Sequence, residues 1–139
     1  KKLWDKRDIL IVEGENSRSG VGNDLFNNAR SVQRIICPSR NACSKIQDIQ
    51  ETVEKYADGK LVFLMLGPTA KVLAYRLSRK GIQAIDLGHI DSEYEWFKMG
   101  ATSKVKFSHK HTAEHNFDQG IELMENEEYS EQIISSVLD

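Results

Sequence analysis

The chain has 139 residues, of which 40% are hydrophobic and 29% charged, and its formal net charge at pH 7 is -2. This composition is typical of a globular protein long enough to bury a core, and the charge balance argues against a nucleic-acid partner or a membrane surface. No run of residues approaches the roughly 20 apolar residues that a membrane span requires. From the length of 139 residues we expect a single domain over residues 1–139.

Four strands are expected in the first part of the chain, because short apolar runs are typical of strands covered on both faces of a parallel sheet. The runs cover residues 8–12, 32–37, 61–66 and 83–87. Apolar residues at steps of three and four predict a helix over 42–56, and a second helix is expected from residue 67 to Gly81. This alternation implies a Rossmann-like, three-layer α/β fold with a mainly parallel sheet of four or more strands.

Shorter elements are expected elsewhere. Residues 24–29 predict a short helix after a polar cap. Another short helix is expected over 93–99 and a short strand over 105–107. At the end of the chain, residues 127–138 carry apolar side chains spaced as on an amphipathic helix.

The segment 108–119 is polar and contains three histidines, His109, His111 and His115. The last two are four residues apart and would share a helix face, as metal ligands often do. Because no cysteine or further helix supplies an obvious fourth ligand, we interpret the segment as a solvated polar stretch.

The two cysteines indicate the redox compartment of the protein, and the first residue indicates whether the chain is part of a longer protein. Cys37 and Cys43 alone do not make a disulfide framework, so we expect reduced thiols and a cytoplasmic protein. The chain begins at Lys1 without an initiator methionine, and we therefore expect it to be part of a longer protein.

The glycine-rich loop over residues 13–24 is the stretch that most suggests a ligand. Its glycines allow sharp turns and a close approach of the backbone to a ligand. Arg18 offers a planar fork of donors suited to phosphate. The loop lacks the third glycine of the dinucleotide fingerprint and the Gly-Lys-Ser/Thr of a P-loop, so a plain surface connection is the alternative.

Two further turns should meet this loop at one edge of the sheet. Gly67, Pro68 and Thr69 follow the third strand, and residues 86–91 follow the fourth. Ligands of open parallel sheets bind beyond the carboxyl ends of the strands. We therefore predict a ligand site where the three segments converge, against the alternative of three ordinary turns.

The segment after the fourth strand combines one imidazole with three carboxylates. His89 could act as a general base or donate to a phosphate or a sugar hydroxyl. If the following residues are helical, Asp91 and Glu95 share a face, from which Glu93 diverges. Two such carboxylates could hold a hard cation or bind sugar hydroxyls. A solvated first helical turn is the alternative.

Several of these stretches together resemble the bacterial GT-D fold glycosyltransferases of streptococcal and lactobacillal glycosylation clusters. The matching stretches are residues 12–26, 35–39, 66–70, 86–96 and 99–102. They occur in the same order as in that family and cover about the first 105 residues.

The resemblance implies a Rossmann-like fold and the transfer of a hexose, typically glucose, from a UDP-sugar to a glycan acceptor on a glycoprotein or cell-surface polysaccharide. It places the loop at the nucleotide-sugar site, through Glu13, Ser17, Arg18, Gly20, Val21, Gly22, Asn23 and Asp24. We add the turn of Gly67, Pro68 and Thr69 to this binding set. By the same resemblance His89 and Glu95 would face the donor or the reaction centre, and Asp91 is a third catalytic candidate.

The family's metal-binding Asp-x-Glu motif has no counterpart here. Asp91, Ser92 and Glu93 have the right residue types but occupy a different family position. The chain therefore resembles the C-terminal portion of such an enzyme. We expect a divalent cation, Mn²⁺ or Mg²⁺, to be held by ligands outside this chain, and the fragment alone to be inactive.

Two other functions compete with sugar transfer. The main alternative is a non-catalytic nucleotide-binding or assembly module of a glycosylation complex, and an exposed apolar face would also favour a homo-oligomer. An NAD-dependent enzyme is disfavoured, because Cys37 and Pro38 stand where an acidic residue would bind the ribose.

Overall fold

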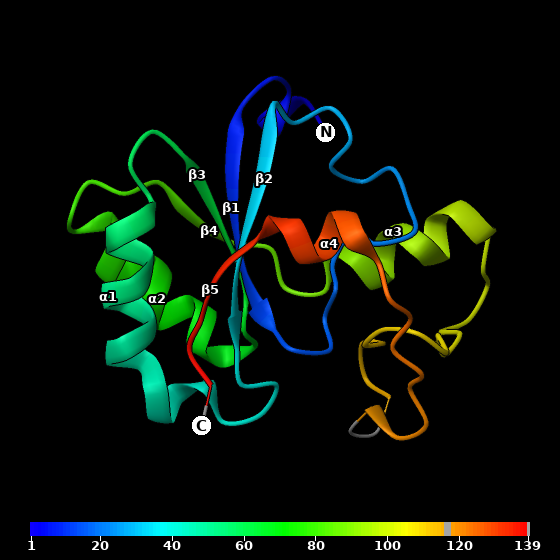
Figure 1. The fold of residues 1–139 in the computed structure, drawn as a ribbon. Helices are drawn as coiled ribbons and strands as arrows, with labels where there is room; N and C mark the ends of the chain where they lie inside the picture. Colours follow the sequence, from blue (N-terminus) through cyan, green and yellow to red (C-terminus); the bar gives the residue numbers. More distant parts are fainter. Residues whose placement is uncertain (116–117, 139) are drawn as a thin grey trace.

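The protein is described by a computed structural model that covers residues 1–115 and 118–138 (Figure 1). Residues 116, 117 and 139 lie outside this description, so the polar segment 108–119 is covered only in part. Within the described ranges, no helix is both long and apolar enough to cross a membrane.

A five-stranded parallel sheet in the order β4-β3-β1-β2-β5 forms the centre of the fold. The strands are β1 (Asp8–Gly14), β2 (Ser31–Cys37), β3 (Leu61–Met65), β4 (Ala84–Asp86) and β5 (Ile133–Ser136). The predicted α/β fold with a parallel sheet is confirmed, and each of the four expected strands is present.

Two helices cover one face of the sheet, seen together in Figure 1. They are α1 (Ile46–Tyr56), preceded by the 3-10 turn η2 (Ala42–Lys45), and α2 (Pro68–Ser78). Ile49 and Leu73 are fully buried against this face of the sheet. The apolar stripe predicted over 42–56 therefore packs as expected, although its first turn is 3-10 rather than α-helical.

The opposite face is covered mostly by irregular backbone. The short 3-10 helix η1 (Lys2–Trp4) begins the chain, and its Trp4 packs beside Phe26 and Phe63 with ring centroids 5.5 Å away in each case. Leu25 is buried in the same cluster. This layer fills the space that a helix would occupy in a regular doubly wound sheet.

The predicted helix over residues 24–29 is wrong, because the structure has turns there. The backbone N–H of Leu25 donates to Asn23 Oδ1 at 3.0 Å, and the Trp4 indole N–H donates to the Leu25 carbonyl at 3.1 Å. The Leu25 carbonyl, which a helix would pair with the N–H of Ala29, is thus taken by a side chain, and that N–H donates to the Phe26 carbonyl at 3.0 Å instead. A six-residue segment also gains too little from helix propagation to resist such competition.

The helix α3 (Ile90–Met99) begins directly after His89, three residues earlier than predicted. After it, the predicted strand over 105–107 is absent. Instead Phe107 packs on Trp96 with ring centroids 6.2 Å apart, forming a small separate core. An aromatic residue needs burial, and here a helix side chain rather than a neighbouring strand provides it.

The end of the chain corrects a further prediction. Only the first half of the expected helix forms, as α4 (Glu127–Gln132), and the chain then continues as β5 beside β2. The N–H of Val137 donates to the carbonyl of Ile36 at 2.7 Å. The β-branched residues after Gln132 favour a strand, and β2 offers them an open edge.

Candidate functional site

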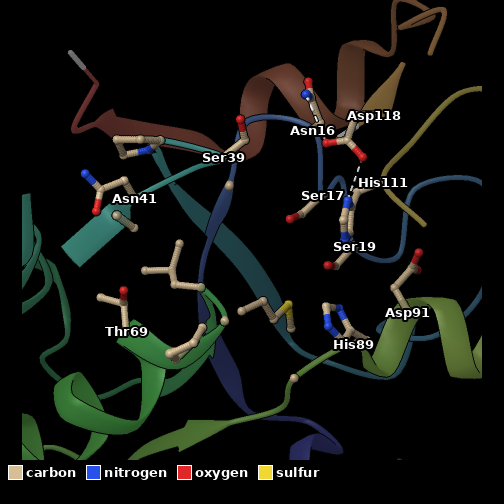
Figure 2. Close-up of a pocket in the computed structure, with 18 of the residues that line it drawn as sticks. Asn16, Ser17, Ser19, Ser39, Asn41, Thr69, His89, Asp91, His111 and Asp118 are labelled. Carbon is tan, nitrogen blue, oxygen red and sulfur yellow. Dashed lines mark hydrogen bonds and ion pairs between the residues drawn. The ribbon is translucent and has the colours of Figure 1, made fainter. Parts of the chain in front are cut away.

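A cavity of about 400 Å³ lies at the carboxyl ends of the strands (Figure 2). Gly14 ends β1, Ser39 follows β2, Met65 ends β3 and His89 follows β4, and all four line the cavity. The strands β2 and β3 lie on opposite sides of β1, so the connections leave the sheet in opposite directions and open a crevice there. The three segments predicted to converge do so at this edge.

Short polar side chains make up much of the lining, and several point into the cavity in Figure 2. They are Asn16, Ser17, Ser19, Ser39, Asn41 and Thr69. Hydroxyl and amide groups of this kind donate to and accept from a polar ligand without imposing a charge. These side chains are therefore suited to a ligand rich in hydroxyl or phosphate oxygens, and the carboxylates of Asp91 and Asp118 also line the cavity.

The predicted site residues divide into two groups. Those that line the cavity are Ser17, Gly67, Pro68, Thr69, His89 and Asp91. Those outside its lining are Glu13, Arg18, Gly20, Val21, Gly22, Asn23, Asp24 and Glu95. Every member of the second group except Glu95 belongs to the glycine-rich loop itself.

Glu13 is fully buried beneath the loop and pairs with Arg34 at 2.5 Å. Its second carboxylate oxygen accepts the backbone N–H of Ser19 at 2.8 Å. Arg34 in turn donates to the carbonyl of Ser19 at 2.9 Å. A buried ion pair of this kind is tolerated because both partners are also hydrogen-bonded, and here it holds the middle of the loop in place.

Arg18 is not among the residues that line the cavity, and it packs against Tyr129 of α4. Its guanidinium is 4.7 Å from the centroid of the Tyr129 ring, and Arg34 lies 4.9 Å from the same centroid. Burial, followed by the charge of Glu13, raises the pKa of Tyr129 to about 12. The contact of Arg18 with a diphosphate stays a prediction, and in this arrangement Arg18 anchors the loop to α4.

Asp24, at the end of the loop, is tied to the surface of α3. It accepts from Lys1 at 2.6 Å and from the Tyr94 hydroxyl at 2.8 Å. The hydrogen bonds from Lys1 and Tyr94 hold the pKa of Asp24 well below its usual range. Its position fits a structural tie better than a ligand contact.

Lys110 joins the loop to α3 from a position that is 1% exposed. Its ammonium group contacts Asp91 at 2.8 Å, Glu95 at 2.7 Å and the carbonyl of Val21 at 3.0 Å. Asp91 also accepts the backbone N–H of Gly20 at 2.7 Å. The prediction that Asp91 and Glu95 share a helix face is therefore confirmed, and the two carboxylates face a lysine rather than solvent.

This contact favours the charged form of Glu95. Burial opposes ionisation of Glu95, but hydrogen bonds from Lys110 and Asn23 together lower the pKa of its carboxyl below the ordinary value. Lys110 was missed because it belongs to the segment interpreted as solvated. That interpretation is wrong for Lys110, Thr112 and Ala113, all of them buried, and no local pattern marks them as such.

Two histidines and an aspartate meet on one side of the cavity in Figure 2. His111 Nδ1 lies 2.7 Å from Asp118 Oδ1. Asn16 donates to the other oxygen of Asp118 at 3.3 Å, and its carbonyl accepts the backbone N–H of His111 at 2.7 Å. The rings of His89 and His111 have centroids 5.7 Å apart.

The described residues do not fit a divalent cation. Among residues 1–115 and 118–138, no group of three or more His, Cys, Asp or Glu side chains is arranged to hold a metal ion. Lys110 pairs with the carboxylates of both Asp91 and Glu95, and Asp118 is already engaged by His111 and Asn16. Hard cations need several free oxygen ligands, so no chemical step is assigned to a metal held by these side chains.

Comparison with known proteins gives consistent matches. A family model described as "Glycosyltransferase GT-D fold" matches residues 1–115. The chain is 61% identical over 139 residues to "Glycosyltransferase GlyD" of Streptococcus pneumoniae, covering all of this chain and 17% of that protein. It is also 61% identical over 137 residues to "Probable glycosyl transferase Gly" of Streptococcus gordonii, covering 99% of this chain and 20% of that protein.

Solved structures match equally closely. "A New Glycosyltransferase (DUF1792) from Streptococcus sanguinis" is 62% identical with a TM-score of 0.97, over 99% of this chain and 51% of that one. A second solved structure is 58% identical, also with a TM-score of 0.97, over 99% of this chain and 50% of that one. It is described as "The highly conserved domain of unknown function 1792 has a distinct glycosyltransferase fold". The chain thus spans about half of these structures and a fifth or less of the curated relatives.

Proposed function

The chain belongs to the family of glycosyltransferases with the GT-D fold, as its motifs indicated, and on this premise we propose that it contributes the donor site of an enzyme that transfers a sugar from a nucleotide. The observation that carries the proposal is the cavity at the carboxyl ends of β1 and β3, where hydroxyl and amide side chains lie beside apolar ones. Its volume lies within the range of small-molecule sites, and this edge is where nucleotides bind in related α/β sheets.

The start of α2 supports a diphosphate in this cavity. Gly67 caps the helix with φ at 54°, Pro68 opens it, and Thr69 faces the cavity. Pro68 has no N–H and the N–H of Ala70 donates to the Gly67 carbonyl at 3.1 Å, so the N–H of Thr69 and the partial positive charge at the helix start are what would favour a phosphate there. The hydroxyls of Ser17 and Ser39 complete a set of neutral hydrogen-bonding groups around it.

The finer parts of the proposal concern the substrates. The donor is a UDP-hexose, with glucose as the sugar, and the acceptor is a glycan on a glycoprotein or a cell-surface polysaccharide. Mn²⁺ or Mg²⁺ would reach the diphosphate through ligands other than the carboxylates described above. The chain acts as one Rossmann-like domain of a longer protein in the cytoplasm, where the free thiols of Cys37 and Cys43 stay reduced.

One observation favours the second candidate function, a non-catalytic nucleotide-binding or assembly module. Asp91 and Glu95, two of the three side chains suggested for catalysis, are paired with Lys110. If the protein is such a module, the same cavity binds a nucleotide but no sugar is transferred. Turnover therefore distinguishes the two functions, and binding alone does not.

The test uses the natural protein that carries this sequence. UDP binding is measured by calorimetry, with and without Mn²⁺, and sugar transfer is followed from UDP-glucose. Thr69→Val keeps the shape of the side chain but loses its hydroxyl, and it should weaken UDP binding about tenfold, the cost of one hydrogen bond. Ser78→Ala, at the exposed far end of α2, is the matched control and should leave binding unchanged. Binding without turnover would favour the module, and absence of both would contradict the donor site.

A further inference from the structure

The donor proposal leaves His111 and Asp118 without a role, although both line the cavity. They come from the segment that follows α3 and are joined at 2.7 Å through Nδ1 of the imidazole. The side chain of His111 is 31% exposed and that of Asp118 is 12% exposed. The imidazole is thus open to the cavity while its aspartate is shielded behind it.

The hydrogen bond to Asp118 determines which ring nitrogen can accept a proton. A carboxylate accepts only from a protonated nitrogen, so a neutral His111 carries its hydrogen on Nδ1 and its lone pair on Nε2. Within the described ranges no hydrogen-bond partner contacts Nε2. An imidazole held by a carboxylate, with the opposite nitrogen open to a site, has the arrangement of a general base.

The aspartate is itself held in place by Asn16. The amide of Asn16 donates to Asp118 and its backbone carbonyl accepts from His111, so one residue of the glycine-rich loop fixes both partners (Figure 2). This connection ties the orientation of the imidazole to the conformation of the loop. The pair is therefore built into the site and is not a chance surface contact.

We propose that His111 is the general base that activates the acceptor hydroxyl, with Asp118 as its positioning residue; this rests on the sugar transfer proposed above. The acceptor oxygen forms a bond to the anomeric carbon while its proton passes to Nε2 of His111. The bond from the anomeric carbon to the diphosphate oxygen breaks, and its electron pair leaves with the diphosphate. A single displacement of this kind inverts the anomeric configuration.

The experiment compares variants of the natural protein in donor binding and turnover. His111→Ala should leave the Kd for UDP within about twofold and lower kcat by 10²- to 10⁴-fold, the usual contribution of a general base. Added imidazole should restore part of the lost turnover, because it can occupy the space that the side chain left. Asp118→Asn should lower kcat by up to about 10⁴-fold, as the same change does in a Ser-His-Asp triad, because an amide no longer holds the proton on Nδ1.

His109→Gln is the matched control, because His109 is exposed and lies outside the cavity lining, and its turnover should stay at the wild-type level. His111→Gln keeps a polar side chain if the alanine variant fails to fold. Wild-type kcat in a folded His111 variant, or a product with retained configuration, would overturn the assignment of the base while leaving the donor site standing. A wild-type protein that transfers no sugar would overturn the proposed function and this assignment with it.

Discussion

At the scale of single residues, the loop depends on one glycine for close packing and on another only for its backbone conformation. Gly20 has φ at 82°, and a Cβ atom added there would lie 2.7 Å from a ring carbon of Phe26. Gly22 has φ at 79°, but nothing lies within 4 Å of an added Cβ atom. Substitutions at Gly20 and Gly22 therefore separate the free-energy cost of backbone strain from the cost of a steric clash.

We predict that Gly20→Ala lowers the free energy of unfolding by about 2–4 kcal/mol, the sum of left-handed strain and overpacking. Gly22→Ala should cost about 1 kcal/mol, because only the backbone term applies. Urea denaturation of both variants measures the difference. Equal losses would show that the contact with Phe26 relaxes freely.

The pairing of Glu95 with Lys110 predicts a dependence of stability on pH. The pKa of Glu95 is lower in the folded state than in the unfolded chain, so its contribution is present above the unfolded value of about 4.3 and is lost as pH falls through the folded value. The free energy of unfolding of the wild type should therefore exceed that of Glu95→Gln by less as pH falls below about 5. Denaturation series at several pH values measure this difference.

Glu93→Gln is the control for that series, because Glu93 is exposed on the same helix. The surface carboxyls of Asp8 and Asp24 also have lowered pKa values, through Arg30 and Lys1, but they are common to all three proteins and cancel in the comparison. If the free energy of unfolding of Glu95→Gln differs from that of the wild type by the same amount at every pH, the prediction is contradicted.

At the scale of elements, α4 holds the glycine-rich loop in place through the contact of Tyr129 with Arg18. It is only six residues long, and Asn126 caps it by accepting the N–H of Tyr129 at 2.8 Å. The Tyr129 ring contacts Arg18 and Arg34, and Arg34 pairs with the buried Glu13. A helix too short to be stable alone is held here by a buried aromatic side chain and by the β5 strand that follows it.

Tyr129→Ala should lower the free energy of unfolding by about 3–5 kcal/mol, as losses of large buried aromatic rings do, and should speed hydrogen exchange in residues 15–23. Tyr129→Phe keeps the ring over both guanidinium groups and should stay within about 1 kcal/mol of the wild type. Denaturation and native-state exchange measure the two effects. If hydrogen exchange in residues 15–23 is unchanged in Tyr129→Ala, α4 does not hold the loop in place.

At the scale of the whole molecule, the cavity is assembled from segments that lie far apart in sequence, and a cysteine on its wall can report on its occupancy. Cys43 is exposed and lines the cavity, whereas Cys37 is buried. Burial, with the nearby charge of Glu13, raises the pKa of the Cys37 thiol to about 12. A thiol of that kind does not react at neutral pH.

We predict that iodoacetamide labels Cys43 alone in the folded protein and that UDP slows this labelling, because a bound nucleotide covers the thiol. Mass spectrometry of labelled peptides gives the rates. Cys37 should react only after denaturation, which serves as the internal reference. Labelling of Cys43 at the same rate with saturating UDP would place the nucleotide elsewhere.

Local sequence determined the central elements and the edge at which the cavity forms. The strands β1 to β4 are short apolar runs, and the stripe that becomes α1 has helical spacing, so each could be predicted without knowledge of the rest of the chain. Since parallel strands joined by crossovers end at the same edge, the meeting of Ser17, Thr69 and His89 followed from the order of elements alone.

Only the tertiary structure decided the rest of the site. The burial of Lys110 requires Asp91 and Glu95 to face it from α3, and the placement of Arg18 requires the Tyr129 ring from α4. The end of the chain becomes a strand because β2 has an open edge beside it. Each outcome depends on a partner distant in sequence, whereas periodicity and propensity report only on neighbours along the chain.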